Sequence, residues 1–262
     1  MSLFLNLNTT LNSVFYFISM KLIKLNATDS TNDFLKRLAG SQILENYTVI
    51  ATDNQVKGRG QMGSTWTSEP GKNLTFSVFL ANALTNVDSI YNLNVAVALA
   101  VLEVLKKENI PELKIKWPND IMSANKKIGG ILIENAIKHS DEIQSIIGIG
   151  LNVNQQNYDG LPQASSLCLA TGRFFDCEEL LTKIIAELKL NVIMINEKDG
   201  TALWKKYHEF LYKKEIPSAF EDKEGHKFMG IIKKVLTNGQ LEVMMEDDSL
   251  QNFNIKELKM LY

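Results

Sequence analysis

The chain has few of the residues on which several common kinds of protein site depend. Its 262 residues include two cysteines, Cys168 and Cys177, in no metal-binding spacing. A disulfide framework or a structural zinc site is therefore not expected, and the low cysteine content suits the reducing cytoplasm. The three histidines, His139, His208 and His226, accompany no motif for nucleophilic catalysis, and we interpret them as ordinary surface or hydrogen-bonded side chains.

Positive charge is not in excess either. The chain carries 28 Lys and Arg against 30 Asp and Glu, a formal net charge of -2. Nonspecific binding to nucleic-acid phosphates is therefore not expected to be its main activity. An anionic ligand would have to be neutralised locally.

Long apolar runs are lacking as well. The run at 14–20 is much shorter than the roughly 20 residues that cross a bilayer, and it lacks the flanks of a signal peptide. We expect no membrane partner, and we interpret residues 1–19 as an N-terminal extension that the protein can do without. With 45% hydrophobic and 22% charged residues, the remaining chain is typical of a globular protein with a substantial core.

Periodicity and turn residues predict two regions. In the first, at 20–214, the predicted elements are an edge strand at 21–25, a short helix that begins after 29–33 and stops at Gly40, strands at 47–52, 74–80, 113–116, 127–134 and 143–152, and helices at 88–108, 178–196 and 200–212. The excess of strands over βαβ units predicts an α+β fold, a mixed sheet packed on helices. In the second region, at 215–262, short strands at 227–236, 241–245 and 253–255 predict a small β-barrel docked on the first.

The most informative segment is glycine-rich and extends from Gln55 to Trp66. It matches G-x-G-x-x-G at 58–63, but a dinucleotide site needs a strand before this motif and a helix after it, and here a turn and a strand follow. A P-loop needs a lysine where Ser64 stands. A third interpretation is a loop that curls around an anion, with Arg59 offering its guanidinium fork to a carboxylate or phosphate.

Three further segments combine polar groups with glycine. KWPND at 116–120 joins a cation, an aromatic ring and two oxygen-bearing side chains in one turn. KKIGGILIE at 126–134 places two lysines before glycines in a strand, which indicates a bulge or close approach of a ligand. GIGLNVN at 148–154 is a second glycine-containing strand that ends in amides.

Together with DSTN at 29–32 and GRGQMGSTW at 58–66, these ordered motifs resemble those of biotin protein ligases, from residue 21 to the C-terminus. The resemblance implies a catalytic domain similar to class II aminoacyl-tRNA synthetases and a C-terminal barrel similar to SH3 domains. It also implies that ATP and Mg2+ activate biotin as biotinyl-adenylate, and that biotin is then transferred to a lysine of a biotin carboxyl carrier protein. About twenty residues precede Lys21, too few for the N-terminal DNA-binding domain of some members, so no DNA partner is expected.

The resemblance also implies roles for individual residues. It assigns Arg59 and Lys127 to catalysis, near the carboxylate and α-phosphate. The biotin pocket would contain Ser30, Thr31, Asn32, Gln55, Gly58, Arg59, Gly60, Gln61, Lys127, Gly129 and Gly130. The nucleotide would meet Arg59, Gln61, Trp66, Lys116, Asn119, Asp120, Lys127 and Asn152, with Mg2+ near Asp120.

Some alternatives stay open at this point. Many members of the family have several arginines in the glycine loop, whereas this chain has Gln61, Met62 and Ser64 beside Arg59. We therefore expect weaker retention of the adenylate. A lipoate or octanoate ligase of the same fold, a nonenzymatic RNA- or protein-binding module, and homodimerisation through a sheet edge are also compatible with the sequence.

Overall fold

The computed structural model describes residues 20–83, 90–138, 143–196 and 200–261. A seven-stranded mixed sheet in the order β1-β2-β3-β7-β6-β5-β4 forms the centre of the molecule. Its strands are β1 (Lys21–Thr28), β2 (Thr48–Gln55), β3 (Leu74–Ala81), β4 (Leu113–Lys116), β5 (Asp120–Ser123), β6 (Lys126–Ile137) and β7 (Ile143–Leu151). β1 and β2 are parallel, and the other neighbours are antiparallel.

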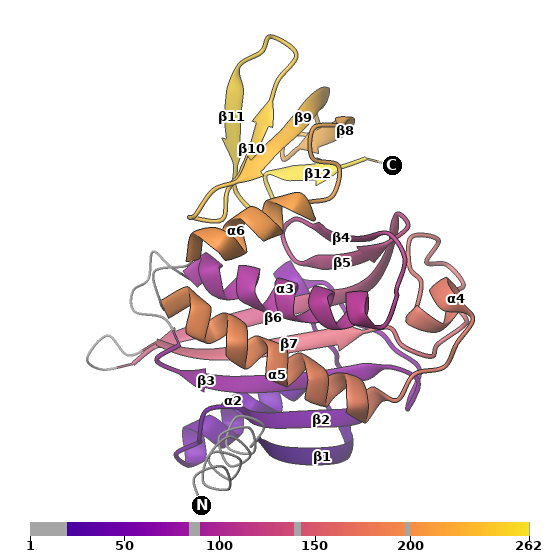
Figure 1. Ribbon diagram of the computed structural model, residues 1–262, viewed down its shortest axis with the longest axis vertical. Helices are drawn as coiled ribbons and strands as arrows, with labels where there is room; N and C mark the ends of the chain where they lie inside the picture. The colour runs from indigo at the N-terminus through magenta and orange to yellow at the C-terminus, as the bar shows by residue number, and fades with distance from the viewer. Residues whose placement is uncertain (1–19, 84–89, 139–142, 197–199, 262) are drawn as a thin grey trace, which may run out of the picture.

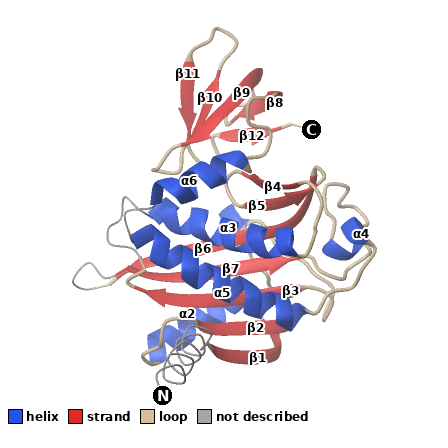
Figure 2. Cartoon of the chain, viewed as in Figure 1, coloured by secondary structure: helices blue, strands red, loops and turns tan. Residues whose placement is uncertain are grey.

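Helices cover both faces of this sheet (Figures 1 and 2). Their bounds are α2 (Thr31–Ser41), α3 (Ile90–Lys107), α4 (Leu167–Thr171), α5 (Cys177–Asn196) and α6 (Gly200–Glu209), with a short 3-10 turn, η1, at Gln61–Gly63. β3 is buried along most of its length because both of its faces are covered. Phe76 and Val78 belong to the large core with α3 and α5, whereas Phe79 packs with Leu35 of α2 in a separate cluster.

A five-stranded antiparallel sheet follows α6, in the order β11-β10-β9-β8-β12. Its strands are β8 (Pro217–Asp222), β9 (Lys227–Val235), β10 (Leu241–Met244), β11 (Leu250–Phe253) and β12 (Leu258–Met260). Figure 1 shows this sheet at the top, beyond α6. The predicted α+β class and its mixed sheet packed on helices are confirmed, and the C-terminal sheet is consistent with the predicted SH3-like barrel. The predicted domain boundary at 214/215 falls between α6 and β8 and stays a prediction.

Several details of the predicted elements are wrong. Gly40 does not stop α2, which continues to Ser41, because Gly40 does not adopt the left-handed conformation in which glycine ends a helix. Strand β5, which begins at Asp120 of the KWPND motif, was not predicted, and neither were α4, β8 and β12. The strand predicted at 253–255 lies at Leu250–Phe253 instead, because residues 254–257 form a turn in which Asn254 N–H donates to Glu257.

The predicted N-terminal extension at 1–19 lies outside the described residues, as does His139 of the three histidines. No helix in the described ranges combines the length and apolar character that a membrane span requires.

Candidate functional site

The strands β3, β7 and β6 build a floor of small residues beneath α2. Thr75, Gly150 and Gly130 stand in register across these strands, and the next row on the same face is Ser77, Gly148 and Leu132. Side chains alternate along a strand, so both rows face the layer that contains α2. Because five of the six residues are glycine, serine or threonine, the floor leaves room above the sheet.

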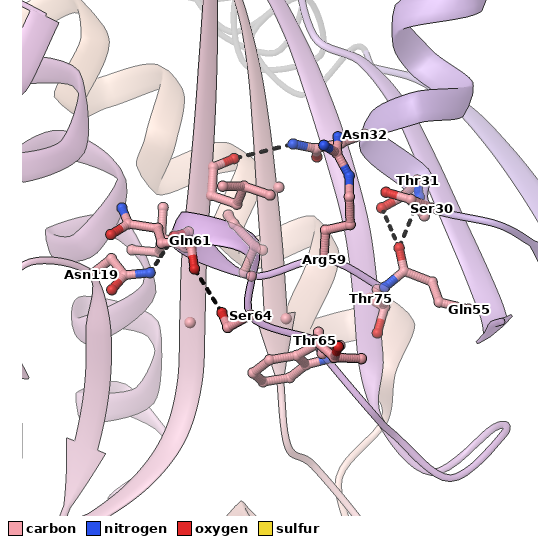
Figure 3. A pocket seen from close by; sticks show the side chains of 18 of the residues that line it. Ser30, Thr31, Asn32, Gln55, Arg59, Gln61, Ser64, Thr65, Thr75 and Asn119 are labelled. Atoms are coloured by element: carbon pink, nitrogen blue, oxygen red, sulfur yellow. Dashed lines mark hydrogen bonds between the residues drawn. The ribbon is translucent and has the colours of Figure 1, made fainter. Parts of the chain in front are cut away.

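A cavity of about 260 Å³ lies over this floor. Figure 3 shows Thr31 and Gln55 on one side of it and Asn119 on the other. Its lining residues are Ser30, Thr31, Asn32, Gln55, Arg59, Gly60, Gln61, Ser64, Thr65, Trp66, Thr75, Phe76, Asn119, Asp120, Lys127, Gly130, Ile131, Leu132, Gly148, Ile149 and Gly150. Five stretches of the chain, at 30–32, 55–66, 75–76, 119–132 and 148–150, thus meet at one concave site.

The start of α2 supplies a buried polar end to the cavity. Gln55 Oε1 accepts hydrogen bonds from Thr31 N–H, at 2.8 Å, and from Thr31 Oγ1, at 3.1 Å. Ser77 Oγ lies 2.7 Å from Thr31 Oγ1 and 2.5 Å from Asn32 Oδ1. Asn32 Nδ2 donates to Glu134 Oε2 at 2.8 Å. These contacts fix the side chains before a ligand arrives, so this end of the site is preorganised.

The glycine loop closes the cavity as a short flap. Arg59 and Thr65 form an isolated antiparallel bridge, and Gly60 N–H donates to Ser64 O at 2.7 Å. We call residues 58–66 the flap. Its last residue, Trp66, lies over Gly150, where a β-carbon would be 2.5 Å from Trp66 Cε2. Glycine at 150 is therefore needed for the indole to approach the sheet.

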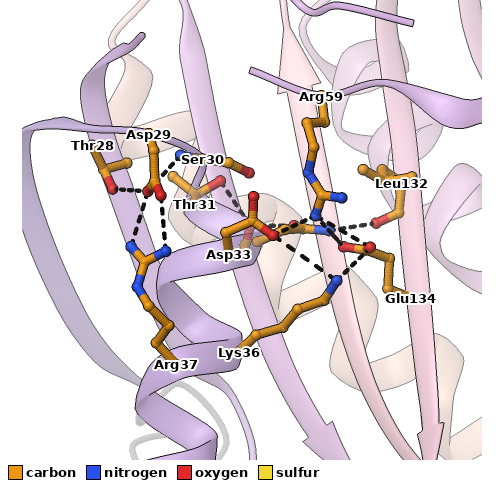
Figure 4. Close-up of polar contacts among 12 residues, drawn as sticks. Thr28, Asp29, Ser30, Thr31, Asp33, Lys36, Arg37, Arg59, Leu132 and Glu134 are labelled. Atoms are coloured by element: carbon orange, nitrogen blue, oxygen red, sulfur yellow. Dashed lines mark hydrogen bonds and ion pairs between the residues drawn. The ribbon is translucent and has the colours of Figure 1, made fainter. Parts of the chain in front are cut away.

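Ion pairs hold the flap against α2 and β6 (Figure 4). Arg59 Nη2 lies 2.5 Å from Asp33 Oδ1 and 3.1 Å from Glu134 Oε2. Lys36 Nζ also pairs with Glu134, at 2.5 Å. Burial raises the pKa of Glu134, but hydrogen bonds from Lys36 and Asn32 outweigh it and hold the pKa below the ordinary glutamate range. The Arg59 guanidinium is thus engaged by two carboxylates, and its predicted contact with an anionic reactant requires an exchange of these partners.

A second cation lies at the other end of the cavity. Lys127 Nζ is 2.6 Å from Asp120 Oδ1 and 5.8 Å from the centre of the Trp66 ring. Asn119 Nδ2 donates to Ile131 O at 2.7 Å, which ties the KWPND turn to β6. The cavity therefore has amides and hydroxyls at one end and a lysine-carboxylate pair at the other.

Two buried polar atoms in the cavity wall have no hydrogen-bond partner among the described residues. They are Trp66 Nε1 and Gln61 Oε1. Such atoms are rare in folded proteins because desolvation without a partner is unfavourable. They indicate where a polar ligand would find a donor and an acceptor.

Most residues that the resemblance implied converge on this cavity, and four do not line it. Lys116 forms the closing pair of the β4-β5 hairpin with Asp120, and burial lowers its pKa. Asn152 donates through Nδ2 to Ser165 O at 2.9 Å. Gly58 lies beneath Trp66, and the backbone N–H of Trp66 donates to Gly58 O. Gly129 packs against Gly150 O. These two glycines permit close packing of the backbone behind the cavity surface.

Several residues that shape the site were not predicted from the sequence. Asp33 and Glu134 bind Arg59, and Ser77 supports Thr31. A signal for Ser77 was present, since a hydroxyl inside a strand buried on both faces needs a partner. No local pattern predicted the roles of Asp33 and Glu134, because their partner Arg59 is distant from both in the sequence.

Comparisons with known proteins agree with this geometry. Residues 25–152 match the biotin/lipoate A/B protein ligase family. Over 228 residues the chain is 28% identical to the bifunctional ligase/repressor BirA of Salmonella typhimurium, covering 85% of this chain and 68% of the relative. Over 170 residues it is 31% identical to the biotin–[acetyl-CoA-carboxylase] ligase of Mycobacterium tuberculosis, covering 63% and 62%.

A solved structure extends the likeness to the whole fold. The biotin protein ligase from Aquifex aeolicus in complex with biotin and ATP superposes with a TM-score of 0.76 at 27% identity, covering 92% of this chain and 98% of the other. Residues 25–152 therefore carry a domain of the biotin/lipoate A/B protein ligase family. The predicted resemblance to biotin protein ligases is confirmed, and with it the assignment to the ligase class of enzymes.

Proposed function

We propose that the protein joins biotin to ATP as biotinyl-adenylate and then transfers biotin to a lysine of a biotin carboxyl carrier protein. The supporting observation is that one cavity combines an amide-rich end and a cationic end under one flap. The amide-rich end suits a neutral polar head group such as the ureido ring of biotin. The cationic end suits the carboxylate and the phosphate that must meet.

The first step forms an oxygen–phosphorus bond between the biotin carboxylate and the α-phosphate, and pyrophosphate leaves. Both reactants are anionic, so bringing them together requires positive charge nearby. Lys127 is the lysine in the cavity wall, and its ammonium would move from Asp120 toward the reacting oxygens. In the second step the carrier lysine attacks the acyl carbon, AMP leaves, and the attacking amine loses a proton.

Magnesium would accompany ATP. Mg2+ commonly takes one or two carboxylates together with phosphate oxygens. Asp120 is the carboxylate among the cavity-lining residues, so its oxygens fit this ion, which would then compete with Lys127 for them. Bound magnesium would neutralise phosphate charge.

Trp66 and Gln61 would close the site over the intermediate. Their buried, unpartnered polar atoms lie in the wall that the flap provides. A closed flap would exclude water, which otherwise hydrolyses an acyl-adenylate. Because Arg59 is the flap's arginine and pairs with carboxylates, the flap offers little net positive charge to hold the adenylate. We therefore infer that this enzyme releases more free biotinyl-adenylate than a relative with several arginines in the loop.

The decisive experiment supplies ATP with either biotin or lipoate, and measures pyrophosphate release and transfer of labelled acid to a biotin carboxyl carrier domain. Biotin-dependent release followed by labelling of the carrier supports the proposal. Release with lipoate alone would reassign the substrate within the same family. For adenylate retention, free biotinyl-adenylate is quantified after filtration, and an amount equal to that from an arginine-rich relative would refute weak retention.

A further inference from the structure

The C-terminal sheet contacts the turn that carries Asn119 and Asp120. Trp117 to Asn119 form a three-residue loop closed by the pairing of Lys116 with Asp120. Trp117 Nε1 donates to Gly239 O in the turn between β9 and β10, at 2.9 Å. Trp117 does not line the cavity, yet Asn119 and Asp120, two and three residues further on, do.

Gly239 also lies against α3, the helix whose side chains bind the Trp117–Asn119 loop. Gly239 is buried with φ +89°, and a β-carbon there would overlap the Tyr91 ring of α3. Tyr91 Oη donates to Pro118 O at 3.2 Å, and Asn94 Nδ2 donates to the same oxygen at 2.9 Å. Trp117 and Pro118 are thus held by hydrogen bonds, Pro118 to α3 and Trp117 to the β9-β10 turn.

A second connection from the C-terminal part reaches the strand before this turn. Ile115 N–H donates to Phe210 O at 2.8 Å, and Tyr212 N–H donates to Ile115 O at 2.9 Å. These residues follow α6 and lead toward β8, so the segment before the C-terminal sheet extends the edge of the main sheet. The hairpin of β4 and β5 is therefore held on one side by this segment and at its tip by Gly239.

From this arrangement we propose that the Asn238-Gly239 turn is a positioning element for the nucleotide end of the cavity. It holds Trp117 so that Asn119 and Asp120 face the cavity, and it acts on affinity for ATP without acting on affinity for biotin. The biotin end is built by α2, Gln55 and Ser77, whose side chains hydrogen-bond to one another and to Glu134 of β6. The inference rests on the proposed function for the identity of the two ligands.

Trp117→Phe tests the proposal, because it removes the indole N–H while keeping an aromatic ring that packs on the core. We expect affinity for ATP to fall roughly two- to tenfold, the effect of one neutral hydrogen bond, with affinity for biotin unchanged. Both are measured on the full chain by titration calorimetry, ATP alone and biotin alone. Gly239→Ala, which displaces the turn from the other side, should lower affinity for ATP at least as much.

The matched control is Trp204→Phe. Trp204 Nε1 donates to Asn92 Oδ1 at 2.8 Å, so the same chemical change removes a hydrogen bond within the helix layer, while phenylalanine keeps an aromatic ring against Tyr91. Affinity for ATP should then stay at the wild-type value. Equal ATP affinity in wild type, Trp117→Phe and Gly239→Ala would overturn the proposal, and so would a parallel loss of ATP and biotin affinity.

The calorimetry also separates this inference from the proposed function. A wild-type chain that binds ATP and biotin but forms no pyrophosphate refutes the proposed reaction, while the shift in ATP affinity still judges the positioning role. A wild-type chain that binds no ATP overturns both. Urea unfolding of each variant identifies any that fails to fold, and the other variant then decides the outcome.

Discussion

Replacing Lys127 by alanine is the sharpest test of the cationic end of the cavity. The change removes one positive charge and leaves the Asp120 carboxylate, 2.6 Å from the former ammonium, without this partner. The variant site is then more negative where two anionic reactants must meet. We expect the rate of the proposed adenylation step to fall much more than the stability of the fold.

The size of the loss follows from the position of the charge. A unit charge about 4 Å from a developing anion is worth roughly 4 kcal/mol at an effective dielectric constant of about 20. Loss of a preorganised electrostatic group typically costs about 100- to 1000-fold in rate. We expect kcat/KM for pyrophosphate release to fall by about that factor. The Lys127 side chain is 37% exposed, so loss of its ion pair should cost about 1 kcal/mol of folding stability or less.

Pyrophosphate release and urea unfolding are measured together on three variants. Lys127→Met keeps most of the apolar stem and should resemble Lys127→Ala in activity. Lys126→Ala removes the exposed neighbouring lysine, which does not line the cavity, and should retain wild-type activity. If Lys127→Ala retains activity within threefold of the wild type, the charge argument for this lysine is wrong.

Three further predictions concern the floor and the flap. Gly150→Ala places a β-carbon 2.5 Å from Trp66, so we expect a loss of biotin-dependent pyrophosphate release of at least tenfold in a chain that still folds cooperatively; wild-type turnover would contradict the packing. Ser77→Ala removes the hydroxyl that supports Thr31, and it should cost about 1–3 kcal/mol of unfolding free energy in urea and weaken biotin binding in calorimetry; an unchanged biotin Kd would show that this support is dispensable. Because the pKa of Glu134 is lowered on folding, its contribution to stability is full above the ordinary glutamate pKa of about 4.3 and is lost as the pH falls through the folded value. Urea unfolding should therefore show a smaller acid-induced loss of stability in Glu134→Gln than in the wild type, and equal losses would refute this linkage.

Much of the fold could be predicted because its long elements carry clear local patterns. The apolar helix at Ile90–Lys107 and the alternating strand at Leu74–Ala81 were predicted to within about two residues at each end. Strands that depend on their pairing partners were harder to predict from the sequence. Asp120–Ser123 is short, and its strand character comes from β4 and β6 on either side. Local sequence carries little trace of such neighbours.

The site residues were predictable to the same extent, from local patterns but not from partners distant in the sequence. Glycines at 130, 148 and 150 signalled close approach to a strand, but the objects that approach them come from elsewhere in the chain. Trp66 lies over Gly150, and Asn32 lies over Gly148. Arg59 illustrates the limit most clearly, since its residue type suggested an anionic ligand while its actual partners are Asp33 and Glu134. Which opposite charge a side chain meets is decided by tertiary packing.

The parallel pairing of β1 with β2, the one such strand pair among the described residues, has a consequence for how the protein can be shortened. Thr28 at the end of β1 pairs with Gln55 at the end of β2, so the two strands deliver the α2 start and the flap to the same edge of the sheet. A chain cut after β1 would keep every glycine of the flap and the lysine opposite it. It would nevertheless lose the strand that helps to set Thr31 beside Gln55, and with it the support of the proposed biotin pocket.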